Sequence, residues 1–257
     1  MTAWHLSRAI LETAWISAPT VFQATIGNLT TEACDRRLDS WSRRLMQQAK
    51  LSVEAEGLEH LVPGETYVVM SNHQSLYDIP VIFQTLNLRV RMVAKSELFK
   101  VPVWAQAMRA SGFVEVDRKN RHRALESLDN AKQALESGTS IWIAPEGTRS
   151  DTGELLPFKK GGFHLALGTG ARILPVSIDG TRNALVARGF NVTNGAHVHV
   201  TVHPPVDPKE FGRERRNELI EHVRSIIGSR VSTHPKSSKS EAPGCGDGAS
   251  RESSADT

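Results

Sequence analysis

The sequence predicts an α/β protein: a mostly parallel sheet flanked by helices, preceded by an N-terminal helical segment. Seven short runs rich in apolar and β-branched residues alternate with stretches in which apolar residues recur every three or four positions. The first pattern is typical of buried strands and the second of amphipathic helices. Because strands and helices alternate and the connections are short, we expect a largely parallel sheet covered on both faces.

The expected elements follow one another from residue 53 to residue 227. Strands are predicted at Val53–Leu58, Thr66–Met70, Val90–Ala94, Phe113–Val116, Ser140–Ala144, Arg172–Ile178 and Val198–Val202. Helices are predicted at Ile79–Leu86, Glu97–Ala110, Arg121–Ser137, Gly162–Gly168 and Pro208–Ile227. Ligands of such sheets usually bind at the carboxyl ends of the strands, which directs attention to the polar residues that follow them.

Composition excludes several classes of protein. Of the 257 residues, 39% are hydrophobic and 23% are charged, which argues against a chain that crosses a membrane many times. The net charge of +3 fits an anionic partner, but the charges are interleaved and lack the pattern of a nucleic-acid-binding module. Cys34 and Cys245 lie too far apart for a disulfide framework or a paired-cysteine metal site, so we expect a reducing compartment.

The first fifty residues are predicted to be helices at a membrane surface. Residues 13–31 contain no Asp, Glu, Lys or Arg, but only nine of the nineteen are apolar, whereas a spanning helix needs roughly 20 apolar residues. A helix over residues 34–50 would be apolar on one side and basic on the other, with Arg36, Arg43 and Lys50. Such a helix could lie flat on an anionic membrane. The alternative is a helix packed on the domain with a solvated charged face.

Three segments follow from these patterns. Residues 1–50 are expected to form the amphipathic, interfacial helices, and residues 51–231 the α/β domain. Residues 232–257 are rich in Ser, Gly, Pro and charge and offer almost nothing to bury. We therefore expect a disordered tail there.

A His and an Asp stand five residues apart where a strand is expected to end and a helix to begin, in residues 72–78 (Asn-His-Gln-Ser-Leu-Tyr-Asp). An imidazole can take a proton from a hydroxyl at neutral pH, and a nearby carboxylate fixes its tautomer and stabilises the imidazolium. His73 and Asp78 are therefore candidates for a general base and its orienting acid. The alternative is a structural turn, in which Ser75 and Asp78 cap the next helix.

A second polar turn follows the strand expected at Ser140–Ala144 and reads Pro-Glu-Gly-Thr-Arg-Ser over residues 145–150. Gly147 lets backbone N–H groups approach a ligand closely. Thr148 offers a hydroxyl, and Arg149 can bind a phosphate through two parallel hydrogen bonds. Alone, this turn is also compatible with an ordinary connection.

Together the two turns resemble the first and third signature motifs of the lysophosphatidate (1-acylglycerol-3-phosphate) acyltransferase family, in its bacterial form. The second motif of that family resembles the series Lys95, Leu98, Ala105 and Arg118, in which Ala105 stands where the family has Gly. The fourth motif resembles residues 173–176 (Ile-Leu-Pro-Val). The matches lie in the family's order across about residues 50–205, and the preceding segment is similar to membrane-associating helices of bacterial members.

The resemblance implies a glycerolipid acyltransferase-like fold and O-acyl transfer. The donor would be an acyl-CoA or acyl-carrier protein, the acceptor the free hydroxyl of 1-acyl-glycerol-3-phosphate, and the product phosphatidate for phospholipid biosynthesis. His73 would take the hydroxyl proton while Asp78 orients it, so neither an acyl-enzyme nor a cofactor is expected. The enzyme would act at the cytoplasmic face of the (inner) membrane, as a peripheral or monotopic protein.

The resemblance also implies a positive pocket for the phosphate of the lysophospholipid acceptor, formed by Lys95, Arg118 and Arg149. The acceptor side would be shaped by the adjoining loop residues Glu146, Gly147 and Thr148. Glu146 is expected to order an Arg or a hydroxyl rather than to titrate.

Two other functions remain compatible with these residues. One is an acyltransferase for a different lysolipid, in phospholipid remodelling or aminolipid synthesis; the retained cations favour an acceptor that carries a phosphate. The other is a non-catalytic lipid-binding protein on the same fold, which would tolerate loss of His73 or Asp78, although both are present.

Three histidines, His197, His199 and His203, share one face of the last expected strand. The sequence shows no acidic or Cys partner beside them, and Pro204 and Pro205 follow at once. We therefore expect surface or packing residues and no metal.

Overall fold

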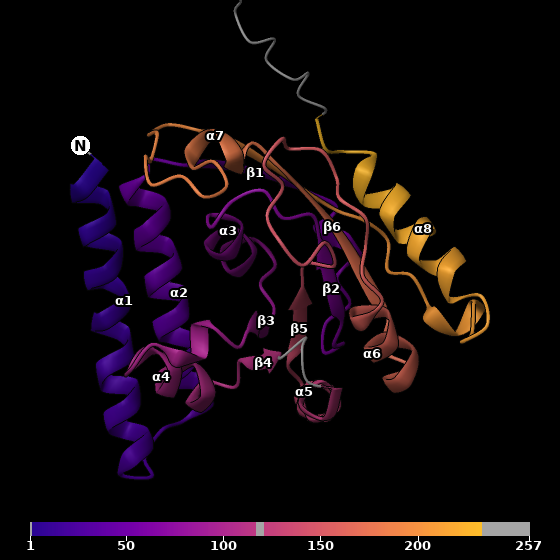
Figure 1. Ribbon diagram of the computed structural model, residues 1–257, viewed down its shortest axis with the longest axis horizontal. Helices are drawn as coiled ribbons and strands as arrows, with labels where there is room; N and C mark the ends of the chain where they lie inside the picture. Colours follow the sequence, from indigo (N-terminus) through magenta and orange to yellow (C-terminus); the bar gives the residue numbers. More distant parts are fainter. Residues whose placement is uncertain (1, 117–120, 233–257) are drawn as a thin grey trace, which may run out of the picture.

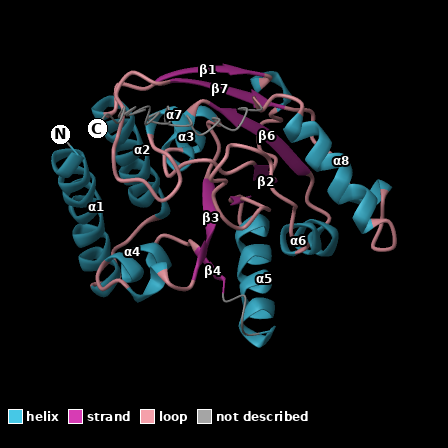
Figure 2. Ribbon diagram, turned by 45° about the horizontal axis from the view of Figure 1, so that its top comes forward, coloured by secondary structure: helices cyan, strands magenta, loops and turns pink. Residues whose placement is uncertain are grey.

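The structure is a computed structural model that describes residues 2–116 and 121–232, and within them seven strands form one sheet (Figures 1 and 2). The strand order is β1-β7-β6-β2-β5-β3-β4. The strands are β1 (Ser52–Glu56), β2 (Val68–Ser71), β3 (Val90–Lys95), β4 (Val114–Val116), β5 (Ser140–Ile143), β6 (Ile173–Asp179) and β7 (His197–Val202). The run from β6 to β4 is parallel, as predicted, so these five strands end at one edge of the sheet.

The remaining two strands run the other way. β7 pairs antiparallel with β6, and β1 pairs parallel with β7 at the end of the sheet. The amino ends of β1 and β7 therefore lie at the same edge as the carboxyl ends of the other strands.

Helices cover both faces of the sheet (Figure 1). They are α1 (Thr2–Thr25), α2 (Thr31–Gln48), α3 (Asp78–Thr85), α4 (Trp104–Ala110), α5 (Arg121–Glu136), α6 (Gly161–Thr169), α7 (Thr181–Ala184) and α8 (Arg216–Gly228). Single turns of 3₁₀ helix accompany them at η1 (Leu58–His60), η2 (Leu98–Lys100) and η3 (Pro208–Glu210).

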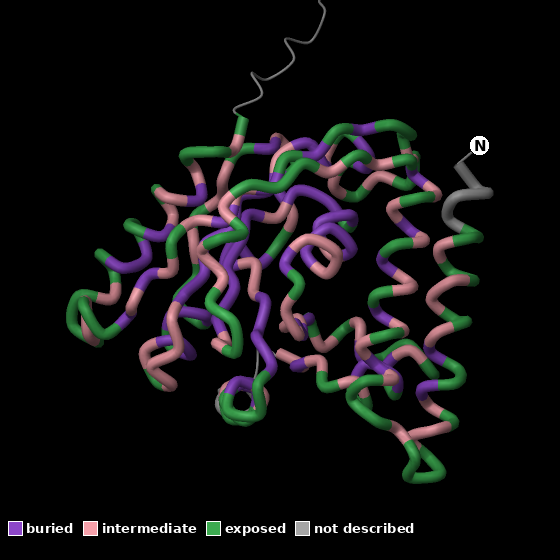
Figure 3. Tube along the Cα trace, turned by 180° about the vertical axis from the view of Figure 1, so that it is seen from behind, coloured by how far each residue is buried: buried purple, intermediate pink, exposed green. Residues whose placement is uncertain are grey.

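Strand β2 shows how the sheet divides the core in two. Val68 and Met70 belong to the cluster that packs against α5, α6 and α8. Val69, which points the opposite way, belongs to the cluster that includes residues of α3, as the alternation of side chains along a strand requires. Figure 3 shows the buried residues concentrated in the sheet and in α3. Both faces of β2 are therefore dry, and this rigid strand carries the turn with the His and Asp.

The predicted strands agree with the observed ones to within two residues at each end, but two predicted helices are interrupted. The helix expected at Glu97–Ala110 consists of η2 and α4, because Pro102 between them has no N–H to donate to a helical carbonyl. The helix expected at Pro208–Ile227 consists of η3 and α8, with Gly212 between them at φ +65°. Helix α7 was not predicted, since four residues carry too little periodicity.

The two N-terminal helices lie side by side and pack on α3 and α4 (Figure 1). The apolar side of α2, with Cys34, Leu38 and Leu45, is buried, and on its other side Arg44 pairs with Glu12 of α1 at 3.0 Å. Helix α2 is thus packed on the domain, and Arg36 and Arg43 of its basic side are exposed; contact of that side with a membrane stays a prediction. Within the described residues, no helix combines the length and the apolarity needed to cross a bilayer.

Two predictions fall outside the described residues. Arg118 lies in the segment 117–120, and the predicted disordered tail lies, except for its first residue, in the segment 233–257.

Candidate active site

The candidate base and its acid are in contact at the carboxyl end of β2. His73 Nδ1 lies 2.7 Å from Asp78 Oδ2. The side chain of Asp78 is fully buried, whereas 18% of the His73 side chain is exposed. The imidazole therefore has one nitrogen on a buried carboxylate and keeps a path to solvent and to a substrate.

Asp78 is held by three further donors. Its Oδ2 also accepts the backbone N–H groups of Gln74 at 2.8 Å and Ser75 at 2.9 Å, and its Oδ1 accepts the hydroxyl of Thr181 in α7 at 2.5 Å. A carboxylate surrounded by donors accepts from His73 as well, so Nδ1 carries the proton and Nε2 presents its lone pair. This is the tautomer that a general base requires.

The capping interpretation of residues 72–78 does not describe the observed helix end. Helix α3 begins at Asp78, and its N-cap residue, Tyr77, makes no side-chain capping hydrogen bond. The Asp78 carboxylate instead accepts the N–H of Ser75 within the preceding turn and contacts the imidazole of His73. The turn therefore fixes the orientation of Asp78 toward His73.

A buried Trp contacts the imidazole from β5. The rings of His73 and Trp142 are 6.1 Å apart and nearly perpendicular, at 85°. Trp142 donates from Nε1 to the hydroxyl of Ser71 at 2.9 Å and is 3% exposed. An edge-to-face contact of this kind limits the rotation of the imidazole.

The second turn holds the backbone of His73 from both sides. Glu146 accepts the N–H of His73 on Oε1 at 2.7 Å and the N–H of Leu156 on Oε2 at 2.8 Å, and the N–H of Ser150 donates to the carbonyl of His73 at 2.8 Å. Glu146 is 2% exposed, and burial raises its pKa to about 7 against the opposing effect of the hydrogen bonds from Leu156 and His73.

The contacts of Glu146 differ from the expected ones. Its carboxyl orders two backbone amides, and neither an Arg nor a hydroxyl is among these partners. A pKa of about 7 also brings the group into its titrating range near neutral pH. The difference arises because the turn folds Glu146 inward, under His73, a contact across 73 residues of chain that no local pattern encodes.

The candidate binding residues gather around one pocket of about 590 Å³ in front of the imidazole. Of the residues predicted from the sequence, the pocket is lined by His73, Lys95, Gly147, Thr148 and Arg149. Glu146 is not in its lining. Arg188, which the sequence did not single out, is in the lining and pairs with Asp151 at 3.3 Å. Glu97 also lines the pocket, so three cationic side chains and one carboxylate surround the space beside the candidate base.

A smaller, apolar cavity of about 130 Å³ adjoins this pocket. The two share Leu76, Ile79, Met92 and Leu98 in their walls. The apolar cavity extends between the N-terminal helices and α4, where its lining includes Ile16, Trp41, Trp104 and Met108. The sequence could not reveal it, because its walls come from four helices and a strand.

The comparisons with known proteins agree with this geometry. A family model described as Acyltransferase matches residues 52–179. The 1-acyl-sn-glycerol-3-phosphate acyltransferase of Salmonella typhimurium is 33% identical over 165 residues, which is 64% of this chain and 66% of that protein. The human protein named 1-acyl-sn-glycerol-3-phosphate acyltransferase alpha is 32% identical over 175 residues, 68% of this chain and 62% of that protein.

Among solved structures, the crystal structure of the 1-acyl-sn-glycerophosphate acyltransferase PlsC from Thermotoga maritima superposes with a TM-score of 0.71 at 29% identity, covering 89% of this chain and 95% of that one. The matches to the curated relatives span slightly less than two thirds of the relatives' length. Motifs, sheet order and relatives agree: the chain belongs to the family of the 1-acyl-sn-glycerol-3-phosphate acyltransferases.

Proposed function

We propose that this protein transfers an acyl group from acyl-CoA or acyl-carrier protein to the free hydroxyl of 1-acyl-glycerol-3-phosphate, forming phosphatidate. The observation that carries the proposal is the single pocket lined by His73, Lys95 and Arg149. A base and two cations around one pocket suit a substrate that carries both a hydroxyl and a phosphate. The relatives from Salmonella typhimurium and human are both named as 1-acyl-sn-glycerol-3-phosphate acyltransferases, which supports this acceptor.

The chemistry follows from the tautomer of His73. Its Nε2 takes the proton of the acceptor hydroxyl as that oxygen attacks the thioester carbonyl, and the contact with Asp78 at 2.7 Å stabilises the resulting imidazolium. When the tetrahedral intermediate collapses, the carbon–sulfur bond breaks and the leaving thiolate takes the proton from Nε2. The ester and the free thiol are the products, and His73 returns to its starting state.

The cations bind the acceptor phosphate in this proposal. Arg149 has the planar fork that pairs with two phosphate oxygens, and Lys95 adds a point charge. Arg149 follows β5, which is adjacent to β2, and Lys95 is the last residue of β3, the next strand along the sheet. The sheet therefore fixes the positions of both backbones relative to His73. Gly147 and Thr148 complete the wall of the pocket, and we assign Arg118 to the same phosphate from its motif position alone.

The apolar cavity suits a fatty acyl chain. It adjoins the reaction pocket through Leu76 and Ile79, and an acyl chain gains about 0.8 kcal/mol for each methylene group that it buries. Its walls include α1 and α2, so a chain entering there would pass the N-terminal helices.

We also place the protein on the cytoplasmic surface of a membrane, bound through α1. Helix α1 exposes large apolar side chains, with Leu11 at 66%, Trp15 at 72% and Phe22 at 64%, and Ile26, just after its end, is 56% exposed. They recur at intervals of four and seven residues and therefore form one stripe. A continuous apolar stripe on an exposed helix is typical of an interfacial contact.

Release of free thiol from acyl-CoA, followed with and without 1-acyl-glycerol-3-phosphate, tests the reaction. The wild type should release thiol only with the acceptor, and His73→Ala should lower the rate by at least about 100-fold. Thiol release without acceptor would identify a thioesterase instead, and an unchanged rate in His73→Ala would refute the proposed base.

The acceptor site is tested by Arg149→Ala, with Arg43→Ala as a matched control on the exposed side of α2. Arg149→Ala should raise the KM for 1-acyl-glycerol-3-phosphate by about 10-fold or more and leave the KM for acyl-CoA unchanged. Arg43→Ala should change neither. If only the donor KM rose, the cations would belong to the donor; equal activity on lysolipids without a phosphomonoester would refute the assignment of the acceptor.

Membrane binding is tested by flotation with anionic liposomes. The double variant Trp15→Ser and Phe22→Ser should lose most of its binding, because each buried aromatic side chain contributes about 2 kcal/mol. Phe190→Ser, which changes an equally exposed Phe in a loop of the domain, is the control. Equal flotation of the double variant and the wild type would rule out α1 as the anchor.

A further inference from the structure

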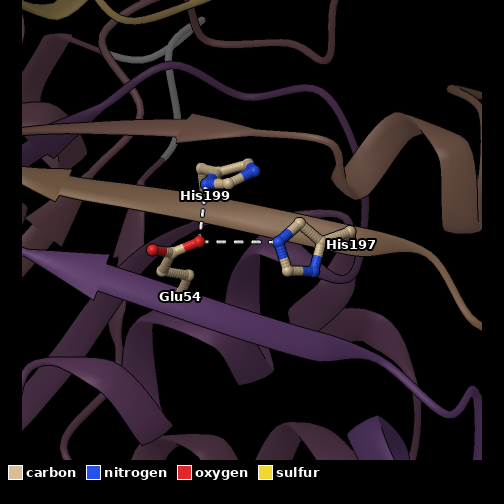
Figure 4. A group of neighbouring side chains, drawn as sticks. All are labelled: Glu54, His197 and His199. Atoms are coloured by element: carbon tan, nitrogen blue, oxygen red, sulfur yellow. Dashed lines mark ion pairs between the residues drawn. The ribbon is translucent and has the colours of Figure 1, made fainter.

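A second cluster of side chains lies on the exposed face of the sheet at β1 and β7, and its members point toward one another (Figure 4). Glu54 Oε2 is 3.4 Å from His199 Nδ1 and 3.6 Å from His197 Nε2. The two His are two residues apart on β7 and so share a face. Glu54 is the direct partner of His199 in the β1–β7 pairing.

The spacing is close to that of a metal site. The three ligand atoms all lie within 4.8 Å of one another. Zinc bonds of about 2.0–2.2 Å to nitrogen and oxygen place tetrahedral ligands about 3.3 Å apart. Two of the three separations already approach this value, and the side chains, with 55%, 56% and 70% exposed, are free to adjust.

A neighbouring hydroxyl selects the necessary tautomer of one ligand. Ser52 Oγ lies 2.6 Å from His197 Nδ1. When Nδ1 carries the proton, it donates a hydrogen bond to the Ser52 hydroxyl. The lone pair of His197 Nε2 is then directed at the cluster. Metal-binding His side chains almost always have such a partner on the second ring nitrogen.

An additional carboxylate adjoins the cluster. Asp179 of β6 is the cross-strand partner of His199 and lines the same surface hollow as Glu54 and His199. Its Oδ1 is buried and finds no hydrogen-bond partner among the described residues. This carboxylate adds negative charge to a hollow that Arg230 also lines.

This site could not be expected from the sequence, because Glu54 is more than 140 residues from the histidines. His203, the third His of the strand, is not a member: it contacts the hydroxyl of Ser177 at 2.8 Å. The sequence beside His197 and His199 contains no acidic residue. Glu54 of β1 supplies the carboxylate, because β1 pairs parallel with β7 and places Glu54 beside His199.

We propose that Glu54, His197 and His199 bind one divalent transition-metal ion, with Zn²⁺ the best fit. Two imidazoles and one carboxylate suit Zn²⁺, whose fourth position would hold water. Among the described strands, β1 pairs only with β7. The ion would cross-link these two strands and so attach β1 more firmly to the sheet. Because β1 follows α2 directly, this metal cross-link would also strengthen the attachment of the N-terminal helices.

Titration of the tag-free full chain with Zn²⁺ in a calorimeter, after removal of metals by a chelator, tests the site. The wild type should bind one ion, and His199→Ala and Glu54→Gln should each weaken binding at least about tenfold. Ser52→Ala should weaken it less than His199→Ala does, by about tenfold. His222→Ala, which removes an exposed His on α8, should bind as the wild type does.

A thermal scan supplies an independent measurement. At a Zn²⁺ concentration about 100 times its Kd, the Tm of the wild type should rise by about 5–10 °C and return on addition of chelator, whereas the Tm of His199→Ala should not rise. His234→Ala reports binding by the segment beyond residue 232. Equal binding by the wild type and His199→Ala, or loss of binding in His234→Ala alone, would overturn the proposal.

Discussion

Replacing Glu146 by Gln should make the free energy of unfolding less dependent on pH between about 4.5 and 7. The carboxyl of Glu146 is 2% exposed, and burial raises its pKa from 4.5 to about 7 although the N–H groups of Leu156 and His73 favour its ionised form. Gln has the same shape but does not titrate, so the difference between the two proteins isolates this one group.

The sign of the Glu146 contribution to the pH dependence follows from the number of protons that the folded and unfolded states bind. The folded carboxyl keeps its proton to a higher pH than the carboxyl of the unfolded chain, so the folded state holds more protons between the two pKa values. The free energy of unfolding therefore falls as the pH rises through that window. A rise from 4.5 to about 7, at about 1.4 kcal/mol for each pKa unit, corresponds to a contribution of about 3 kcal/mol that is present at low pH and lost near pH 7.

Urea unfolding of the wild type and Glu146→Gln at a series of pH values between 4 and 8 measures this difference. Groups common to both proteins cancel when one curve is subtracted from the other. Gln accepts only one of the two backbone N–H groups through its carbonyl, so the variant should be less stable at pH 4.5 and should gain about 3 kcal/mol relative to the wild type by pH 7.5. Two parallel curves would show that the folded carboxyl titrates as in the unfolded chain.

Three further substitutions test contacts around the site. Thr181→Val removes the hydroxyl that donates to Asp78 at 2.5 Å and should lower the free energy of unfolding by about 1–3 kcal/mol; an unchanged urea midpoint would contradict this. Asp35→Ala leaves Arg91, which is 4% exposed, without its carboxylate at 2.6 Å and should destabilise by about 2–3 kcal/mol, measured in the same way. Gly180→Ala, at φ +96°, would bring its Cβ to 2.1 Å from a carbonyl oxygen of β7 and should lower the Tm by several degrees; an unchanged Tm would mean that the β6–α7 turn yields easily.

The strands were predictable because each is a short apolar run bounded by polar residues, and the central strands, dry on both faces, show that pattern most strongly. Helix interruptions were harder to predict. The residues before and after Pro102 both fit a helical pattern, and only the missing N–H decides the outcome. The antiparallel direction of β7 was not predicted, because the strand's apolar alternation is the same in either direction.

At the site, the contact between His73 and Asp78 was accessible from the sequence because both lie in one turn of seven residues. The partners that hold this pair were not. Thr181 reaches Asp78 across 103 residues, and Trp142 donates to Ser71 across 71 residues. Each side chain reads locally as an ordinary turn or strand residue, so only the sheet order brings it to the site.

The position of the candidate base relative to the cations follows from one pair of neighbouring strands. β2 and β5 are adjacent and parallel, so the turns that follow them meet at the same edge of the sheet. The turn after β5 holds both backbone polar groups of His73, through Glu146 and through the N–H of Ser150, and the same turn carries Arg149. The backbone of His73 is therefore hydrogen-bonded to the turn that carries Arg149. Any change that loosens the turn should move the candidate base and the proposed phosphate site together. This arrangement suits the proposed reaction, in which a hydroxyl is aligned by binding a phosphate on the same molecule.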